Sequence, residues 1–391
     1  MKITSIRATP VNIPYTASYV FSHGSIKSLT KTIVEVETDQ GATGLGEVAD
    51  GNRAADVEKM GETLIGVDIR EINTAERRCL PGIRYTPWGN VAGMRRAFGG
   101  IEMAMWDARA RIEEVPLHVL LGGAVRSEIA LSEYFGYRLP GVSEKGEQTP
   151  EEVAEYCARM IEEHGATNFE GKVATVDLDE EVRMIRLIRE AIGDRPLKLD
   201  ANGGWTVQTA RDAIRRMDDY VIHYYEEPVE TYEEMAQLRP FTRANFSTHV
   251  MDLPKAVRLN CPDTMVTNLV EMGGIARTVE FIRACEQFDV GFRFHSGETS
   301  VASAAYLQVS AAMEHIREPS QTLFRWYADD VCNEGTPVPK NGVVPVPTGP
   351  GLGVTLDQKA MKRCHERFLE EGEFPKTDNN NRTYRTHFTR I

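Results

Sequence analysis

The sequence lacks the features of membrane-spanning, secreted and nucleic-acid-binding proteins. It has no apolar run of about 18 residues, the length that a membrane-spanning helix requires, and no signal peptide precedes its first predicted strand. Its six cysteines include no Cys-x-x-Cys pair, which argues against a zinc site or a disulfide framework. Acidic residues outnumber basic ones, 58 to 45, and the net charge of −13 disfavours nucleic-acid binding. We therefore expect a cytoplasmic protein with no membrane or nucleic-acid partner.

The sequence also lacks low-complexity tracts and a glycine-rich nucleotide-binding loop. The fold is predicted instead from the pattern of apolar residues. A chain of 391 residues that is 41% hydrophobic can form a barrel of about 250 residues with a smaller domain beside it. The pattern divides the chain into three parts. Residues 1–125 are α+β in character, residues 126–340 alternate between strand and helix, and residues 341–391 are first rich in proline and then helical.

The first part contains a predicted hairpin and a predicted helix. Residues 31–38 alternate between apolar and polar side chains, residues 39–41 form a turn, and residues 43–48 continue as a strand. The spacing then changes, and residues 99–112 place their apolar side chains on one helical face.

From residue 126 onward, short apolar runs alternate with amphipathic segments. The expected strands are 169–173, 197–200, 221–226, 246–251, 264–269, 291–294 and 322–327. The expected helices are 150–163, 179–192, 206–217, 232–238, 253–259, 275–287 and 299–316. Such alternation is typical of an α/β fold with a (β/α) barrel, whose active site lies at the carboxyl ends of the strands.

Two neighbouring strands of this set end in acids, Asp200 and Glu226. Because parallel strands deliver their last side chains to the same edge, the two carboxylates are expected to lie together. Carboxylate oxygens are the ligands that a hard divalent cation such as Mg²⁺ prefers. In the alternative interpretation, Asp200 caps a helix and Glu226 belongs to a solvated loop pair with Glu227.

Several motifs together resemble the enolase superfamily, in its mandelate racemase and muconate lactonizing enzyme group. The motifs are Gly41-Ala42-Thr43-Gly44-Leu45-Gly46-Glu47, Glu102-Met103-Ala104-Met105-Trp106-Asp107, Leu120-Leu121-Gly122-Gly123, Leu199-Asp200-Ala201-Asn202, Tyr225-Glu226-Glu227-Pro228 and Pro350-Gly351-Leu352-Gly353. The chain is most similar to the glucarate dehydratase branch at Lys31-Thr32-Ile33-Val34, Ser247-Thr248 and Phe294-His295-Ser296. The resemblance implies a modified (β/α) TIM-type barrel with an α+β capping domain formed by both chain ends, to which residues 341–391 would return.

The resemblance also implies a metal centre. In the superfamily, three strand-end ligands hold Mg²⁺, and the metal neutralises the enediolate formed when the proton α to a carboxylate is removed. Asp200 matches the first ligand and Glu226 the second. The third position holds His249, where most relatives have an acid and the glucarate branch has asparagine. Imidazole is a softer ligand than Mg²⁺ usually takes, so Mn²⁺ or another divalent metal is also compatible, and Asp252 is an alternative third ligand.

By the same resemblance, Lys172 and His295 are the catalytic side chains. Lys172 matches the second lysine of the family's Lys-x-Lys motif, and a lysine beside a divalent cation has a lowered pKa that suits a general base. Relatives have another lysine where this chain has Glu170. An aspartate orients the histidine in relatives, and here that position is Asn268. We expect Asn268 to hold the His295 ring by a hydrogen bond but to leave it less basic.

Four side chains are expected to bind the substrate. Two loops of the capping domain would contribute His23 and Arg84, and two strand ends would contribute Asn202 and Arg325. An arginine at a strand end is suited to clamp a carboxylate through two parallel hydrogen bonds. The pocket would accordingly take a polar, anionic ligand.

We expect a Mg²⁺-dependent lyase that dehydrates an acid sugar of the glucarate, galactarate or aldonate type to a 2-keto-3-deoxy product. Lys172 or His295 would be the base, with His295 as the acid for the departing hydroxyl. Racemisation, epimerisation or cycloisomerisation would use the same deprotonation. Another alternative is a metal-binding protein of this fold whose activity has lapsed, as the unusual Glu170, His249 and Asn268 would suggest. The expected partners are a small-molecule carboxylate substrate and further copies of the same chain in a homo-oligomer.

Overall fold

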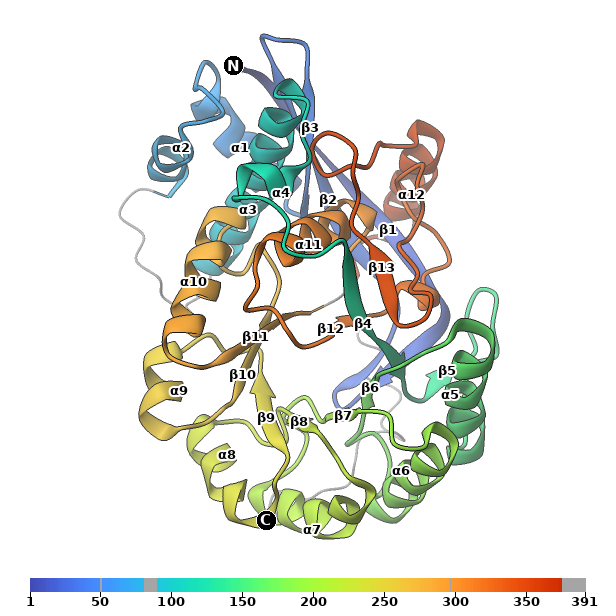
Figure 1. Cartoon of the computed structure of the whole chain (residues 1–391). Helices are drawn as coiled ribbons and strands as arrows, with labels where there is room; N and C mark the ends of the chain where they lie inside the picture. The colour runs from blue at the N-terminus through green and yellow to red at the C-terminus, as the bar shows by residue number, and fades with distance from the viewer. Residues whose placement is uncertain (50, 81–89, 296, 375–391) are drawn as a thin grey trace.

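The computed structural model of the protein describes residues 1–49, 51–80, 90–295 and 297–374. These residues form a barrel surrounded by helices and a second, antiparallel sheet beside it (Figure 1). Within the described ranges, no helix is both long and apolar enough to cross a membrane. The predicted fold class, a modified (β/α) barrel with an α+β capping domain, is confirmed.

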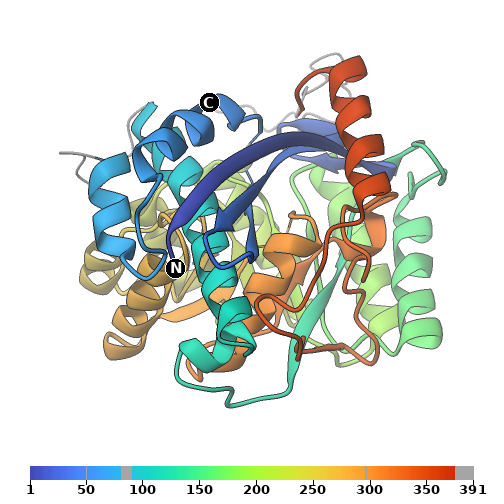
Figure 2. The ribbon, with the colours of Figure 1, turned by 90° about the horizontal axis from the view of Figure 1, so that it is seen from above.

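The antiparallel sheet has the strand order β3-β2-β1-β5 and belongs to the capping domain. Its strands are β1 (Ile3–Phe21), β2 (Gly24–Thr38), β3 (Thr43–Val48) and β5 (Arg138–Leu139). The helices of this domain are α1 (Ala54–Leu64), α2 (Ile72–Cys79), α3 (Asn90–Ile112) and the short α4 (Leu117–Leu120). The predicted hairpin corresponds to β2 and β3. Figure 2 shows that α12 (Gln358–Glu371), near the C-terminal end, lies along β1, so both ends of the chain build this domain.

Two glycines of β3 allow α3 to lie directly on the sheet. A Cβ atom at Gly46 would lie 2.0 Å from the carbonyl oxygen of Gly100, and one at Gly44 would lie 2.0 Å from that of Ala104. Any side chain at either position would push the helix away. The close approach buries Ile101, Ala104 and Ala108 against the strand side of the capping domain.

The barrel sheet has the order β11-β10-β9-β8-β7-β6-β4-β12, and its neighbouring strands are parallel. The strands are β4 (Glu128–Phe135), β6 (Phe169–Lys172), β7 (Leu197–Asp200), β8 (Tyr224–Glu226), β9 (Asn245–Thr248), β10 (Thr264–Thr267), β11 (Gly291–Phe294) and β12 (Ser320–Thr322). The backbone N–H of Phe294 donates to Ser320 Oγ at 3.1 Å, so the two end strands meet and the barrel is nearly closed. A further strand, β13 (Val343–Pro345), pairs antiparallel with β4.

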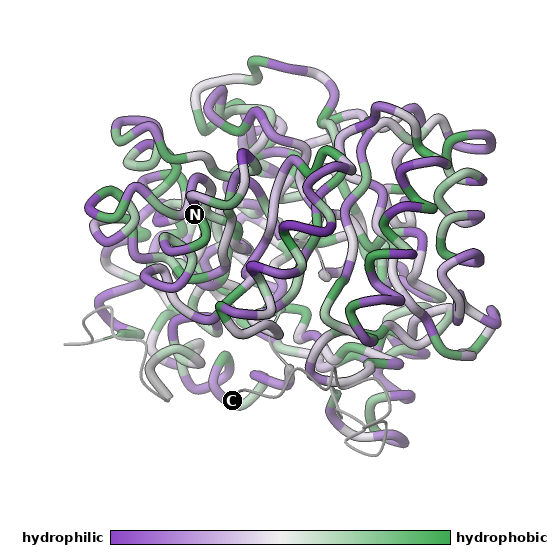
Figure 3. The backbone as a smooth tube through the Cα atoms, turned by 90° about the horizontal axis from the view of Figure 1, so that it is seen from below, coloured by the Kyte–Doolittle hydropathy of each residue, from purple (hydrophilic) through white to green (hydrophobic). Residues whose placement is uncertain are grey.

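Most helices outside the barrel begin at residues whose side chains cap them; α10, which follows Gly274, does not. Thr149, Asp177 and Thr206 each accept a hydrogen bond from a backbone N–H of the first helical turn, as N-cap residues do. The α-helices are α5 (Pro150–His164), α6 (Leu178–Ile192), α7 (Val207–Met217), α8 (Tyr232–Leu238), α9 (Leu253–Leu259), α10 (Ile275–Gln287) and α11 (Ser300–Ala312). The 3₁₀ helices are η1 (Asp218–Tyr220), η2 (Arg239–Phe241) and η3 (Phe324–Trp326). Hydrophilic and hydrophobic turns alternate along the outer helices in Figure 3, as expected for helices with one face on a core.

The structure differs from the predicted elements at the first and last strands of the barrel. Strand β4 is absent from the predicted set because Ser132 and Glu133 interrupt its apolar run. The strand predicted at 322–327 ends at Thr322, because the Thr322 hydroxyl accepts the N–H of Phe324 at 3.1 Å and turns the chain into η3. Arg325 is therefore carried away from the strand end to which the prediction assigned it.

Candidate metal centre and active site

Three adjacent strands of the barrel bring Lys172, Asp200 and Glu226 to the same edge. Lys172 is paired with Asp200 in the register of β6 and β7, and Asp200 is paired with Glu226 in the register of β7 and β8. Because the strands are parallel and in register, the three side chains emerge at the same level. All three are buried. Two ionised carboxylates buried on neighbouring strands require a cation between or beside them.

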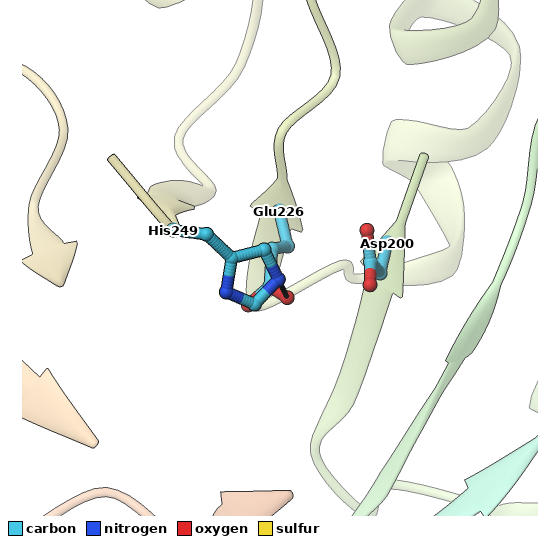
Figure 4. A group of neighbouring side chains, drawn as sticks. All are labelled: Asp200, Glu226 and His249. Carbon is cyan, nitrogen blue, oxygen red and sulfur yellow. Dashed lines mark ion pairs between the residues drawn. The ribbon is translucent and has the colours of Figure 1, made fainter. Parts of the chain in front are cut away.

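Asp200, Glu226 and His249 form a group that can hold a metal ion. One potential ligand atom from each lies within 4.8 Å of the others. Figure 4 shows the imidazole of His249 over the carboxylate of Glu226, with Asp200 on the adjacent strand. His249 Nε2 lies 3.1 Å from Glu226 Oε1, and His249 Nδ1 lies 3.1 Å from the carbonyl oxygen of Val266. That carbonyl can only accept, so Nδ1 carries a hydrogen and Nε2 is the nitrogen presented to the carboxylates.

These residues fit a divalent cation. Two carboxylates and one imidazole form a donor set with which Mn²⁺ is fully compatible and which Mg²⁺ can also accept. Burial lowers the pKa of His249, but the neighbouring Glu226 carboxylate outweighs this effect and raises the pKa to about 10. A divalent cation would therefore compete with a proton for His249 Nε2.

The structure does not place the alternative ligand, Asp252, in this group. Its carboxylate caps α9 and accepts the backbone N–H of Lys255 at 3.1 Å. Asp252 is thus a helix N-cap residue, and the geometry favours His249 as the third ligand.

Lys172 forms an ion pair with Asp200 and lies under two aromatic rings. Its Nζ is 5.8 Å from the ring centroids of both Tyr19 and Tyr134. Burial lowers the pKa of Lys172, but Asp200, Tyr19 and Glu226 together outweigh burial and raise it above its ordinary value. The lowered pKa that was expected of Lys172 would therefore require a divalent cation bound to the Asp200 carboxylate.

His295 follows β11 and faces the same centre from the opposite side of the barrel. Its ring lies edge-on to that of His249, with 4.9 Å between the centroids. Burial, helped by the positive charges of His249 and Lys172, holds the pKa of His295 well below its usual value. The predicted low basicity thus agrees with the structure, but its physical causes are burial and nearby cations.

Asn268 does not have the orienting role expected of it. Its side-chain oxygen accepts the backbone N–H groups of Val270 and Glu271, at 3.1 and 3.0 Å, and closes the turn after β10. No hydrogen bond joins Asn268 to His295 in the described part of the chain. An asparagine side chain readily bonds to backbone groups two or three residues onward, and that local bond has prevailed here.

A cavity of about 380 Å³ lies between the centre and the capping domain. It is lined by Tyr15, Tyr19, Phe21, His23, Ile26, Leu29, Lys31, Lys172, Asn202, Glu227, His295, Gly297 and Leu323. The predicted residues His23 and Asn202 therefore lie at this cavity. The backbone N–H of Asn202 also donates to Asp200 Oδ1 at 2.9 Å, which anchors the first metal ligand.

The lining residues that escaped the sequence prediction include Tyr15, Lys31 and Leu323. Lys31 could have been recognised from the sequence, because it is a charged side chain within the buried stretch of β2, where apolar and polar residues alternate. Its Nζ donates to the carbonyl oxygen of Ala49 at 2.7 Å. Nothing in the local sequence indicated that β1 and β2 reach over the mouth of the barrel.

Arg325 is not part of this cavity. Its Nε lies 2.9 and 2.8 Å from the two carboxylate oxygens of Glu133, and its Nη2 donates to the carbonyl oxygen of Pro339. It lines a separate cavity with Tyr156 and His164. The expectation that Arg325 clamps the substrate is therefore wrong, because its guanidinium already binds an internal carboxylate. Arg84, the other predicted cation, lies outside the described residues.

Comparison with protein families shows to which family the chain belongs. Residues 152–360 match the family described as "Enolase C-terminal domain-like", and residues 3–122 match the N-terminal domain of the mandelate racemase / muconate lactonizing enzyme family. The chain belongs to the mandelate racemase / muconate lactonizing enzyme family. This enolase-superfamily protein is similar to a probable glucarate dehydratase from Streptomyces coelicolor, with 26% identity covering 95% of this chain and 93% of the relative.

Other relatives of this enolase-superfamily chain catalyse different reactions. A D-xylonate dehydratase from Haloferax volcanii is 26% identical over 87% of this chain and 86% of its own length. An N-succinyl-L-Arg/Lys racemase from Bacillus cereus is 25% identical over 93% of this chain and 97% of its own. The family membership thus establishes an enzyme-type site without deciding between a lyase and an isomerase.

Solved structures of similar proteins contain magnesium. An enolase from Thermobispora bispora, complexed with magnesium and formate, has a TM-score of 0.90 and 26% identity, and the match covers 99% of this chain and 100% of that one. An enolase from Pseudomonas fluorescens with bound magnesium, potassium and tartrate has a TM-score of 0.87 and 26% identity over 95% and 93% of the two chains. Magnesium binding is therefore a property of relatives with this superfamily fold.

Proposed function

We propose that this protein is a Mg²⁺-dependent lyase that removes the proton α to the carboxylate of an acid sugar and eliminates the β-hydroxyl as water. The observation that carries the proposal is the meeting of Asp200, Glu226 and His249 beside Lys172 and His295. Two dehydratases among the relatives support this reaction type.

The side chains divide the work in the following way. Asp200, Glu226 and His249 would hold the metal. When bound, the metal supplies positive charge that stabilises the substrate carboxylate as the α-proton leaves. Lys172, after losing a proton, would accept the α-proton at Nζ. His295, in its protonated form, would deliver a proton to the departing hydroxyl.

The lining of the cavity favours a substrate with one carboxylate. Arg325 is bound to Glu133 and does not reach the cavity. Lys31 and Lys172 are the lysine side chains among its described lining residues. Lys31 Nζ donates to the carbonyl oxygen of Ala49, and the cavity wall near Tyr15 and Phe21 is largely apolar. Removing a second carboxylate from water there is costly unless Lys31 pairs with it. Aldonates are therefore better candidates than glucarate or galactarate.

Isomerisation is the second candidate function. Lys172 and His295 both line the cavity, and acid–base groups on two sides of a substrate permit proton removal on one face and return on the other. The racemase relative supports this alternative. It would use the same first step with the same residues.

The proposal is tested with a panel of D-xylonate, D-gluconate, D-galactonate, D-glucarate and galactarate, each incubated with the protein and MgCl₂ in D₂O. Release of a 2-keto-3-deoxy acid supports the lyase. Deuterium incorporation at C2 without loss of water supports isomerisation. If no compound exchanges its C2 proton or loses water in the presence of the protein and either Mg²⁺ or Mn²⁺, the proposed function is rejected for acid sugars.

A further inference from the structure

A buried network of charges fills the barrel beneath the metal ligands. Glu170 on β6 and Arg293 on β11 have side chains that are 0% exposed. Arg293 Nη1 donates to Glu170, and Arg293 Nη2 donates to Glu226 Oε2 at 2.5 Å. One guanidinium therefore joins a carboxylate outside the metal group to a carboxylate within it, and it does so across the interior of the barrel.

The same network holds both oxygens of Glu226. Oε2 accepts from Arg293 and, at 3.0 Å, from the hydroxyl of Ser247. Oε1 accepts from Gln321 Nε2 at 2.7 Å and faces His249. Gln321 Nε2 also donates to Glu170, at 2.6 Å. Groups from β9, β11 and β12 thus fix the plane of the carboxylate.

Stability alone is a poor explanation for such an arrangement. Taking a guanidinium and two carboxylates out of water costs several kcal/mol per ion, and well-packed apolar side chains often stabilise a core as well or better. The planar guanidinium of Arg293 binds two carboxylates at fixed angles and so fixes their orientation. A lysine at the same place would not. The carboxylate oriented here belongs to the candidate metal centre.

We propose that Arg293, anchored by Glu170, is a positioning residue for the metal centre: it sets the orientation in which Glu226 meets the cation. The inference rests on the proposed metal binding. Groups that hold a metal ligand from behind typically contribute a factor of about 10 to 100 in metal affinity. The effect should appear in metal affinity itself, without substrate.

The test compares variants by calorimetric titration with MgCl₂ and with MnCl₂. Glu170→Gln with Arg293→Met removes one negative and one positive charge, so the net charge of the barrel interior is unchanged while the fork is lost. We expect the dissociation constants to rise about tenfold or more. The matched control is Glu147→Gln with Arg138→Met, which removes another buried pair, joined at 2.7 Å between Arg138 Nε and Glu147 Oε2. Its metal affinity should stay within about threefold of the original, whatever its melting temperature.

An unchanged metal affinity in the Glu170/Arg293 variant, with only a lower melting temperature, would overturn the proposal. If that variant does not fold, Arg293→Lys decides, because it keeps the charge but cannot bind both carboxylates as a fork. A weakened affinity in Arg293→Lys supports positioning, and an unchanged affinity overturns it. If the unaltered protein binds neither metal, the proposed function itself fails, which is a separate outcome.

Discussion

Glu298 predicts a pH dependence of stability that can be worked out from the structure. The residue lies two positions before Ser300, the first residue of α11, and is 2% exposed. Among the described residues, its carboxylate oxygen Oε2 has no hydrogen-bond partner. Burial raises the pKa of Glu298 to about 7; Lys31 opposes this shift and Glu47 adds to it.

The sign follows from the two pKa values. The folded state binds the proton of Glu298 more tightly than the unfolded state, where the pKa is near 4.5. The contribution of Glu298 to the free energy of unfolding is therefore largest below pH 4.5 and is lost as the pH rises through about 7. The full effect is about 3 kcal/mol, of which about 2 kcal/mol is lost between pH 5.5 and pH 8. For a chain of this length, about 2 kcal/mol corresponds to roughly 2–3 °C in melting temperature.

The assay compares the melting temperatures of the unaltered protein and Glu298→Gln at pH 5.5 and pH 8. Because glutamine does not titrate, the variant should lose about 2–3 °C less than the unaltered protein over this interval. Glu366→Gln, on the exposed side of α12, is the control and should follow the unaltered protein. Identical pH dependence in the unaltered protein and Glu298→Gln would refute the reasoning.

Three further substitutions test the metal centre and the capping domain. Asp200→Asn should abolish Mg²⁺ binding in calorimetry, because an amide oxygen replaces a charged ligand; an unchanged affinity would remove Asp200 from the centre. His249→Asp should raise the preference for Mg²⁺ over Mn²⁺ by about tenfold, because oxygen is the harder ligand; an unchanged ratio of the two dissociation constants would argue against direct ligation. Gly46→Ala should destabilise the protein by about 1–3 kcal/mol, because its Cβ would meet the Gly100 carbonyl oxygen; an unchanged melting temperature would contradict the close packing of α3 on β3.

The parts of the molecule that could be predicted from the sequence depend on local patterns. The hairpin of β2 and β3 follows from period-two alternation around a turn, and the N-caps Thr149 and Thr206 mark helix starts within a few residues. Asp200 and Glu226 could be placed together because a run of apolar residues that ends in an acid specifies a strand end in a parallel sheet.

The features that could not be predicted depend on partners that are distant in sequence. Arg325 binds Glu133, which is 192 positions earlier, and Arg293 binds Glu170, which is 123 positions earlier. No local pattern distinguishes a strand-end arginine that is free for a substrate from one that is already paired. Asn268 is a different case: its bond to the next turn was local, but the family pattern had suggested a longer-range partner.

Deuterium exchange at the α-carbon tests the central claim most directly. The substrate is whichever acid sugar of the panel the unaltered protein converts, with MgCl₂ in D₂O, and exchange is followed by NMR. Lys172→Ala should lose exchange by a factor of about 100 or more, because the base is missing. His295→Asn should retain exchange and lose elimination of water. Exchange that persists in Lys172→Ala but disappears in His295→Asn would contradict the assignment of Lys172 as the base.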